Sequence, residues 1–251
     1  MSDWGDLSDE LDAWQRAECR AHFWWRDDDA TGVTPALLRL LDLAHRHETP
    51  VALAVIPRDA KDDLRRHLAD RPLAWVLQHG WSHDNHAPDG DRQEEFGVHR
   101  SLPAMLAELA EGWRRIGGFA RAVPVMVAPW NRMDPHLLPH LPAVGLTAVS
   151  TLGPRQRPEA APGVRRTNVH VDLIDWQGTR GFMGAGLVLE QVLAHLRARR
   201  AGTADADEPT GLMTHHGFHD EGCWAFIDEL LARTRAHPAV RWLAAPEAFG
   251  R

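Results

Sequence analysis

Aspartates and histidines gather at two points of the chain. Three consecutive aspartates, Asp27 to Asp29, follow an aromatic segment, and His79, His83 and His86 fall within eight residues of one another. One carboxylate and two imidazoles can hold a divalent ion while leaving positions open for water and substrate, which is the ligand set of a catalytic metal site. The pattern therefore indicates metal chemistry.

Each of these groups also has an ordinary explanation. Adjacent carboxylates repel one another, and a bound cation removes that penalty, but aspartates are also common in solvated turns that cap a following helix, here 34–47. His79 and His83 are four residues apart, so both imidazoles can face one ion. Isolated histidine pairs are more often surface or core residues. Three histidines in a short segment, together with the aspartates, favour the metal interpretation.

A later pair of histidines, His215 and His216, follows an apolar segment. A histidine at that point could act as a general acid that protonates a leaving group, and it could equally be a capping or solvated residue. Trp130 follows Pro129 and could form the wall of a sugar-sized cleft, although tryptophan is more often a core residue.

Composition limits the classes of partner. The 251 residues carry a formal net charge of −7 without an evident basic face, so we expect no nucleic-acid partner. Cys19 and Cys223 lie far apart and fit neither a disulfide framework nor a zinc finger. The acidic N-terminus resembles no signal peptide, and no apolar run is long enough to suggest a membrane span. These features predict a soluble, cytoplasmic protein.

Strand-like and helix-like segments alternate along the chain, which is typical of βα units around a parallel sheet. Seven or eight strand candidates favour a barrel over an open sheet. We expect residues 1–20 to form an N-terminal amphipathic segment with a helix at 7–18, residues 21–251 to form one domain, and residues 153–163 and 201–209 to be loops. The predicted strands are 21–26, 50–57, 73–78, 124–129, 146–150, 169–174, 208–214 and 239–244, and the predicted helices of the domain are 34–47, 58–70, 101–116, 186–200 and 222–234.

Polar residues of catalytic type follow five of these strands. In parallel α/β folds the loops at the carboxyl ends of the strands converge on one face and build the active site there. We therefore expect the aspartates, the first histidine group, Trp130, the segment 172–176 and the second histidine pair to share one face of the fold.

These segments resemble the motifs of the polysaccharide deacetylase family, carbohydrate esterase family four, which includes the nodulation-type chitooligosaccharide deacetylases. HGWSH at 79–83 matches the family's H-[S/T]-x-x-H motif best, and the other four motifs occur in the family's order. The resemblance spans roughly residues 24 to 216. It implies an α/β fold, a distorted (β/α) barrel with about seven parallel strands.

The resemblance also implies roles for individual residues. Asp29, His79 and His83 would hold one divalent ion, with zinc the simplest choice, and Asp28 would be the catalytic base that takes a proton from water. A shift by one residue would give these two roles to Asp27 and Asp28, and the sequence leaves both assignments open. We favour the first because Ala30 then occupies the small-residue position that follows the pair in the family.

The later motifs concern the leaving group and the substrate. LMTH at 212–215 implies that His215 is the general acid, and VDLIDW at 171–176 implies that Asp172 orients it. The same comparison places Pro129, Trp130 and Trp176 at the substrate.

The sequence departs from the family at two positions. Gly80 replaces the usual Ser or Thr of the second motif, and Ala128 stands where the third motif has an Arg that pairs with the catalytic Asp. Arg26 or Arg132 could substitute for that arginine. Glu94 and Glu95, in a polar stretch at 88–97, are interpreted as solvated.

The predicted function is a metal-dependent hydrolase that removes an acyl group, acetyl in the family, from an amino sugar or related carbohydrate-like substrate. Its partner would be a small-molecule or oligosaccharide substrate. A non-catalytic deacetylase-like protein that binds a glycan or another ligand is the alternative, and the missing third-motif arginine favours it. A non-haem iron oxygenase uses the same ligand types but fits the order of the motifs poorly. Whether an amide or an ester is cut, the role of His86 and the oligomeric state stay open.

Overall fold

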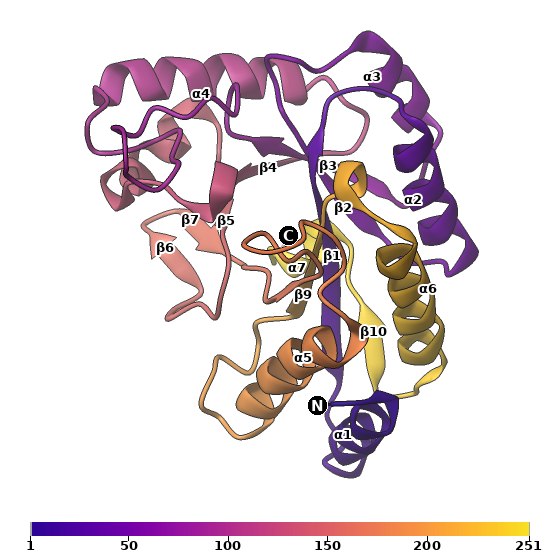
Figure 1. Ribbon diagram of the computed structural model, residues 1–251. Coiled ribbons are helices and arrows are strands. Elements are labelled where there is room, and N and C mark those ends of the chain that lie inside the picture. The colour runs from indigo at the N-terminus through magenta and orange to yellow at the C-terminus, as the bar shows by residue number, and fades with distance from the viewer. Residues whose placement is uncertain (1, 251) are drawn as a thin grey trace.

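A ten-residue strand at the centre of the molecule organises the fold. The computed structural model describes residues 2–250, and Figure 1 shows β1 (Ala21–Ala30) running through the middle of a curled sheet. β1 pairs in parallel with β9 (Thr210–Thr214) on one side, and with β10 (Val240–Trp242) and then β2 (Val51–Val55) on the other. Because β1 is covered on both sides, nearly all of its residues are buried, including Arg26 and Asp27.

From β2 the sheet continues in parallel through β3 (Ala74–His79), β4 (Ala122–Val127) and β5 (Ala148–Ser150). The segment 164–172 closes the ring: its first part, β7 (Val164–Arg166), pairs with β5, and its last part, β8 (Val171–Asp172), pairs with β9. Between these two parts, a parallel bridge from Val169 to Leu152 extends the pairing on the β5 side. The pairing is thus continuous around a distorted parallel barrel, which confirms the predicted fold class.

Helices cover the outside of this sheet (Figure 1). Their N-termini follow simple local rules: in α2 the Thr34 side chain accepts a hydrogen bond from the Leu37 N–H, and Pro35 occupies the first helical position. In α6 Asp220 accepts from the Cys223 N–H in the same way. The α-helices are α1 (Trp4–Arg16), α2 (Pro35–Arg46), α3 (Asp62–Ala69), α4 (Leu102–Ile116), α5 (Ala185–Arg200), α6 (Glu221–Ala236) and α7 (Ala245–Ala248).

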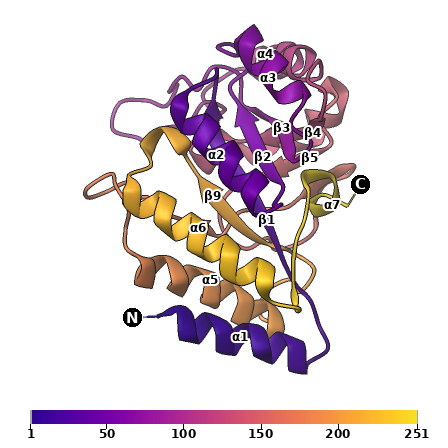
Figure 2. The ribbon, with the colours of Figure 1, turned by 90° about the vertical axis from the view of Figure 1, so that its right-hand side faces the viewer.

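The N-terminal helix α1 packs beside α5 (Figure 2). It begins earlier than the expected 7–18 because the Asp3 carboxylate caps the free N–H groups of its first turn. Leu7, Leu11 and Trp14 are buried against the domain, and Glu10, itself buried, forms a two-pronged ion pair with Arg200 of α5. This contact attaches the helix to the domain.

One predicted loop contains regular structure. Within 153–163 lies β6 (Glu159–Ala161), which forms an antiparallel pair with β7. Short 3-10 helices occur at η1 (Pro129–Asn131), η2 (Pro135–Val144) and η3 (His216–Phe218), and the prolines inside η2 prevent a longer α-helix there. Among the helices of residues 2–250, none is long and apolar enough to cross a membrane.

Candidate active site

A bulge in β1 aims two neighbouring carboxylates at one place. In a regular strand successive side chains point to opposite faces, so Asp28 and Asp29 would diverge. The register between β1 and β2 shifts between Asp27 and Ala30, and Asp29 has a left-handed backbone with φ of +70°. A β-bulge of this kind redirects a side chain at the end of a strand. The strain therefore lies where the sequence predicts the metal ligand.

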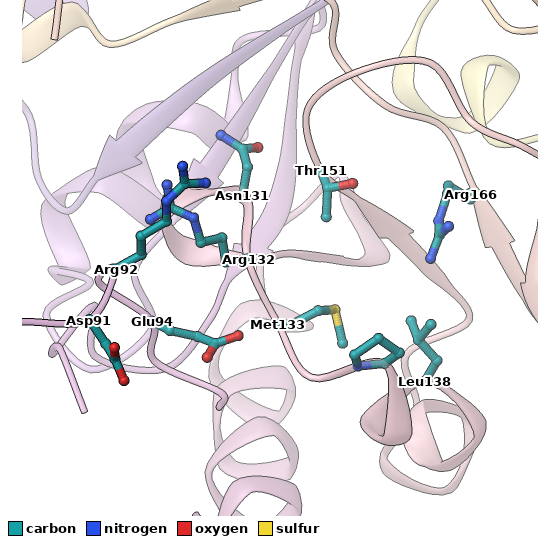
Figure 3. Close-up of a pocket in the computed structure, with 10 residues that line it drawn as sticks. Asp91, Arg92, Glu94, Asn131, Arg132, Met133, Leu138, Thr151 and Arg166 are labelled. Carbon is teal, nitrogen blue, oxygen red and sulfur yellow. The ribbon is translucent and has the colours of Figure 1, made fainter. Parts of the chain in front are cut away.

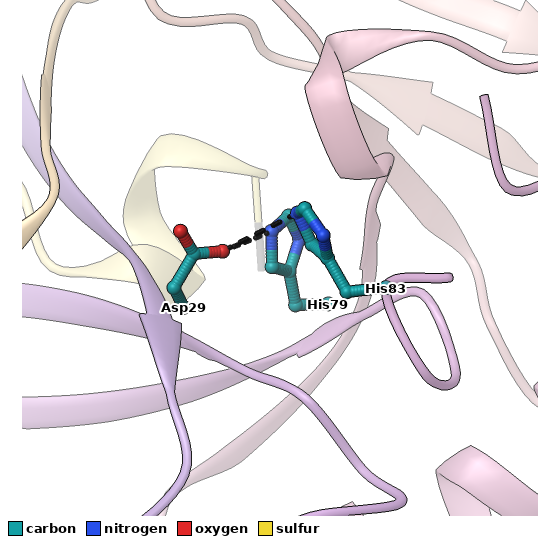
Figure 4. Close-up of side chains that lie close together, drawn as sticks. All are labelled: Asp29, His79 and His83. Atoms are coloured by element: carbon teal, nitrogen blue, oxygen red, sulfur yellow. Dashed lines mark hydrogen bonds and ion pairs between the residues drawn. The ribbon is translucent and has the colours of Figure 1, made fainter. Parts of the chain in front are cut away.

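Asp29, His79 and His83 meet at the carboxyl ends of β1 and β3 (Figure 4). The Asp29 Oδ1 lies 3.1 Å from His79 Nε2 and 3.4 Å from His83 Nε2. His79 ends β3, and the turn that follows it brings His83 back to the same point, with a left-handed φ of +59° at His83. The three side chains predicted to hold an ion are thus brought together.

The hydrogen-bonding of His79 fits a metal ligand. Its Nδ1 lies 3.1 Å from the Val127 carbonyl oxygen, which can only accept, so Nδ1 carries a hydrogen. In a neutral ring this leaves a lone pair on Nε2, directed at the Asp29 carboxylate. Two electron-rich atoms at that distance need a cation or a proton between them. A backbone carbonyl that fixes the tautomer is also the usual second partner of a metal-bound histidine.

The charges of the three groups are strongly coupled. Burial opposes ionisation of Asp29, but the hydrogen bond and positive charge of His79 outweigh it, and the pKa of Asp29 is lowered. Burial likewise acts to lower the pKa of His79, and the Asp29 hydrogen bond with the Asp28 and Asp29 charges raises it overall. For His83 burial dominates, and its pKa is lowered. The site thus favours a carboxylate with positive charge beside it.

Asp28 is held in a buried ion pair with Arg26. The guanidinium donates to both carboxylate oxygens, from Nε to Oδ1 and from Nη2 to Oδ2, each at 2.8 Å. Arg26 also donates to Ser150 Oγ at 2.8 Å and to Asn131 Oδ1 at 2.7 Å. Arg132, the other candidate, donates instead to the Gln93 carbonyl. Arg26 therefore supplies the ion pair that the missing third-motif arginine would make.

Asp27, the alternative in the shifted assignment, is engaged elsewhere. Its Oδ1 lies 2.5 Å from His216 Nδ1, and its Oδ2 accepts hydrogen bonds from Thr214 Oγ1 and from the His216 N–H. Asp27 is completely buried and does not belong to the ligand group. This arrangement supports Asp28 and Asp29 as the working pair.

His215 lies beside the predicted base, with its Nε2 3.9 Å from the Asp28 Oδ2. Its predicted partner Asp172 is occupied differently: the carboxylate accepts from the Ile174 N–H at 3.1 Å and from Trp176 Nε1 at 2.8 Å. Burial raises the pKa of Asp172. Within residues 2–250, no hydrogen bond joins Asp172 to His215, whose buried Nδ1 has no partner. The structure links Asp172 to His215 through Trp176, whose indole N–H binds the Asp172 carboxylate and whose ring meets the His215 imidazole.

Aromatic rings flank His83 and His215. Trp130 lies against His83 with ring centroids 4.2 Å apart, and its backbone is left-handed, with φ of +51°. Trp176 meets His215 edge to face at 4.8 Å. Phe218, which the sequence did not single out, extends this wall beside Trp176 and is 45% exposed. Pro129, which the resemblance places at the substrate, is buried in the structure.

A cavity of about 540 Å³ opens beside this group (Figure 3). Asn131, which binds Arg26, lines it together with Arg132 and Thr151. Arg92, from the loop after His83, also lines it, and Arg166 lines the opposite side in Figure 3. The cavity therefore reaches the Arg26–Asp28 pair through Asn131, and it is large enough for a sugar-sized group.

A second group in the structure also contains two histidines and a carboxylate. It consists of His170 just before β8, Glu208 just before β9, and His195 on α5. Here the His170 Nδ1 accepts a hydrogen bond from the Gly211 N–H at 3.0 Å, so the hydrogen of the neutral ring sits on Nε2. That nitrogen lies 3.3 Å from the Glu208 Oε2. With its hydrogen on Nε2 the ring has no lone pair there to offer an ion, although among residues 2–250 this buried nitrogen makes no regular hydrogen bond.

Comparison with solved structures shows which fold this is. A Mycobacterium smegmatis protein assigned to the polysaccharide deacetylases matches with a TM-score of 0.68 and 18% identity, covering 91% of this chain and 88% of that one. A family 4 acetyl xylan esterase from Clostridium thermocellum, solved with cobalt, matches with a TM-score of 0.56 and 14% identity over 91% and 90% of the chains.

A carbohydrate esterase family 4 pseudoenzyme from Bacillus anthracis also matches, with a TM-score of 0.58 and 12% identity over 92% of this chain and 66% of that one. No protein-family model matches the sequence, and neither does any curated protein. The chain therefore has the fold of the family 4 polysaccharide deacetylases and esterases.

Proposed function

We propose that this protein is a metal-dependent deacetylase of the polysaccharide deacetylase family, which hydrolyses an acetyl group on an amino sugar or a related carbohydrate. The observation that carries the proposal is the juxtaposition of Asp29, His79 and His83 with the Arg26–Asp28 pair and His215. A ligand group with open positions, a neighbouring carboxylate and a neighbouring imidazole are the parts that acyl hydrolysis requires.

Two side chains beside the ligand group, Asp28 and His215, carry out the two proton transfers. A divalent ion held by Asp29, His79 and His83 would polarise the acyl carbonyl and lower the pKa of a water molecule. Asp28 accepts the proton of the attacking water, and Arg26 fixes the orientation of that carboxylate and compensates its buried charge. His215 donates a proton to the leaving amine or alkoxide.

The walls of the site suit a carbohydrate. Trp130 and Trp176 stand on either side of the histidines, and sugar rings commonly bind against such aromatic faces through their C–H groups. The cavity beyond Asn131 offers room for further residues of an oligosaccharide. Zinc suits two imidazoles and a carboxylate, and the cobalt in the related esterase is compatible with the same ligand types.

A ligand-binding protein without catalytic activity is the alternative. The Bacillus anthracis pseudoenzyme has the same fold, and Asp172 makes no hydrogen bond to His215 among residues 2–250. Such a protein would bind the acetylated glycan and leave it unchanged.

The test is an acetate-release assay on acetylated chitooligosaccharides and acetylated xylan, with zinc or cobalt supplied. We expect turnover by the wild type and a loss of about 10²–10⁴-fold in kcat for Asp28→Asn, with one metal ion retained per chain. The matched control is Asp84→Asn, on the exposed face of the loop, which should keep wild-type turnover. Full activity of Asp28→Asn would contradict the assignment of the base, and glycan binding without turnover would favour the alternative.

A further inference from the structure

Glu95 is a buried carboxylate outside the predicted catalytic set. The polar stretch around it suggests a solvated side chain, and this interpretation is wrong because Glu95 is completely buried. Its backbone lies in the loop between β3 and α4, where Phe96 is also buried and the Glu95 carbonyl accepts a hydrogen bond from Arg100. A carboxylate at such a position needs a compensating set of donors.

Those donors all come from the turn that carries the histidines. The Glu95 carboxylate accepts from three successive backbone N–H groups: Ser82 at 2.7 Å, His83 at 3.2 Å and Trp81 at 3.2 Å. The Ser82 hydroxyl donates a fourth hydrogen bond at 2.9 Å. Successive N–H groups that converge on one anion form a nest, which fixes the backbone between them.

The same contact explains why residue 80 is a glycine. Gly80 has a left-handed φ of +53°, and a Cβ there would lie 2.1 Å from the Glu95 Oε2 and 2.6 Å from the Pro129 Cγ. Both features exclude the Ser or Thr of the related motif. A carboxylate from the following loop thus occupies the space where a side chain at position 80 would stand.

We propose that Glu95 is a positioning residue for the metal centre, which holds the 80–83 turn in the one conformation that directs His79 and His83 at Asp29. The inference rests on the proposed metal site. It follows because His79 directly precedes this turn and His83 ends it, so the shape of the turn sets the separation and direction of their Nε2 atoms. Partners of this kind contribute to metal affinity without touching the ion.

The experiment measures zinc affinity of the full chain by competition with a chelating dye, for Glu95→Gln and Glu95→Ala. We expect about 10–100-fold weaker binding in Glu95→Gln and a larger loss in Glu95→Ala. Ser82→Ala removes the hydroxyl contact alone and should show the smallest loss. The matched control is Glu108→Gln, which breaks an ion pair to Arg100 in the same region, makes no contact with the 80–83 turn and should bind zinc like the wild type.

Two readouts separate positioning from general stability. Circular dichroism must show that each variant is folded, and excess zinc should restore most of the kcat of Glu95→Gln, because the defect lies in metal affinity. Folded Glu95→Gln and Glu95→Ala proteins that bind zinc as tightly as the wild type would overturn the role of Glu95. A wild type that binds no zinc would instead overturn the proposed function.

Discussion

The barrel carries two groups of the same composition, each with two histidines and one carboxylate, at opposite ends of its strands. Asp29, His79 and His83 lie at the carboxyl ends of β1 and β3, whereas Glu208 precedes β9 and His170 precedes β8. In the first group the Asp29 side chain is 32% exposed, and in the second the Glu208 side chain is 0% exposed. Only the first group is open to solvent and substrate.

The direction of one hydrogen bond separates the two groups further. The Nδ1 of His79 faces a backbone carbonyl, which leaves a lone pair on Nε2, whereas the Nδ1 of His170 receives a backbone N–H, which leaves a hydrogen on Nε2. His170 then stacks on His195 with centroids 3.4 Å apart, as two neutral rings can. Residue types alone therefore do not define a metal site, because the backbone around each imidazole decides which nitrogen is free.

The largest expected effect tests this difference in metal binding. His79→Ala/His83→Ala removes two of three ligands and should weaken zinc binding by more than about 100-fold. His170→Leu/His195→Leu, the corresponding change in the second group, should leave one zinc bound per chain. Equilibrium dialysis with elemental analysis measures both. A loss of zinc from the second double variant alone would show that the two groups have been interpreted the wrong way round.

A smaller effect concerns the stability that the second group provides. His170→Leu leaves the Gly211 N–H without its acceptor in the buried interior, at a cost of about 2 kcal/mol. For a domain of this size that corresponds to a Tm lower by about 4 to 8 °C. His45→Leu, at an exposed histidine of α2, is the control and should change Tm little. An unchanged Tm for His170→Leu would mean that the group contributes no stability.

The sequence was sufficient for the parts of the site that depend on local spacing. His79 and His83 belong to one turn, and Asp29 ends a strand that apolar residues define, so their meeting follows from a parallel fold. The choice between the two aspartate pairs did not follow, because it depends on the bulge at Asp29. A bulge changes the direction of a side chain without a distinct signature in the residue types.

The sequence also does not reveal which polar residues are buried by contacts with other segments of the chain. Glu95 lies in the polar stretch 88–97, and its carboxylate is buried against the backbone of the 81–83 turn. Arg26 was one of two candidates for the missing arginine, and only the packing of β1 against Ser150 and Asn131 selects it. The hairpin of β6 and β7 was missed in a segment rich in proline and charge, where strand pairing outweighs local preference.

The smallest expected effect is a change in how strongly the free energy of unfolding depends on pH. It concerns the second group, through His195. Burial is the main cause that lowers the pKa of His195 from an unfolded value of 6.5 to about 2, and the positive charge of the nearby Arg199 acts in the same direction. Between these values the unfolded chain binds a proton at His195 that the folded chain excludes, so the free energy of unfolding falls as the pH falls below 6.5. Full linkage at one such site amounts to about 1.4 kcal/mol per pH unit.

His195→Leu should therefore show a shallower loss of stability than the wild type when urea unfolding is compared at pH 6.5 and pH 5.5, both with chelator present. Burial also lowers the pKa of His170 and, to about 4, that of His219, so part of the slope should remain. Parallel slopes in the two proteins would mean that His195 is protonated in the folded state. The second group would then carry a positive charge beside Glu208, and its neutral, stacked description would have to be replaced by a buried ion pair.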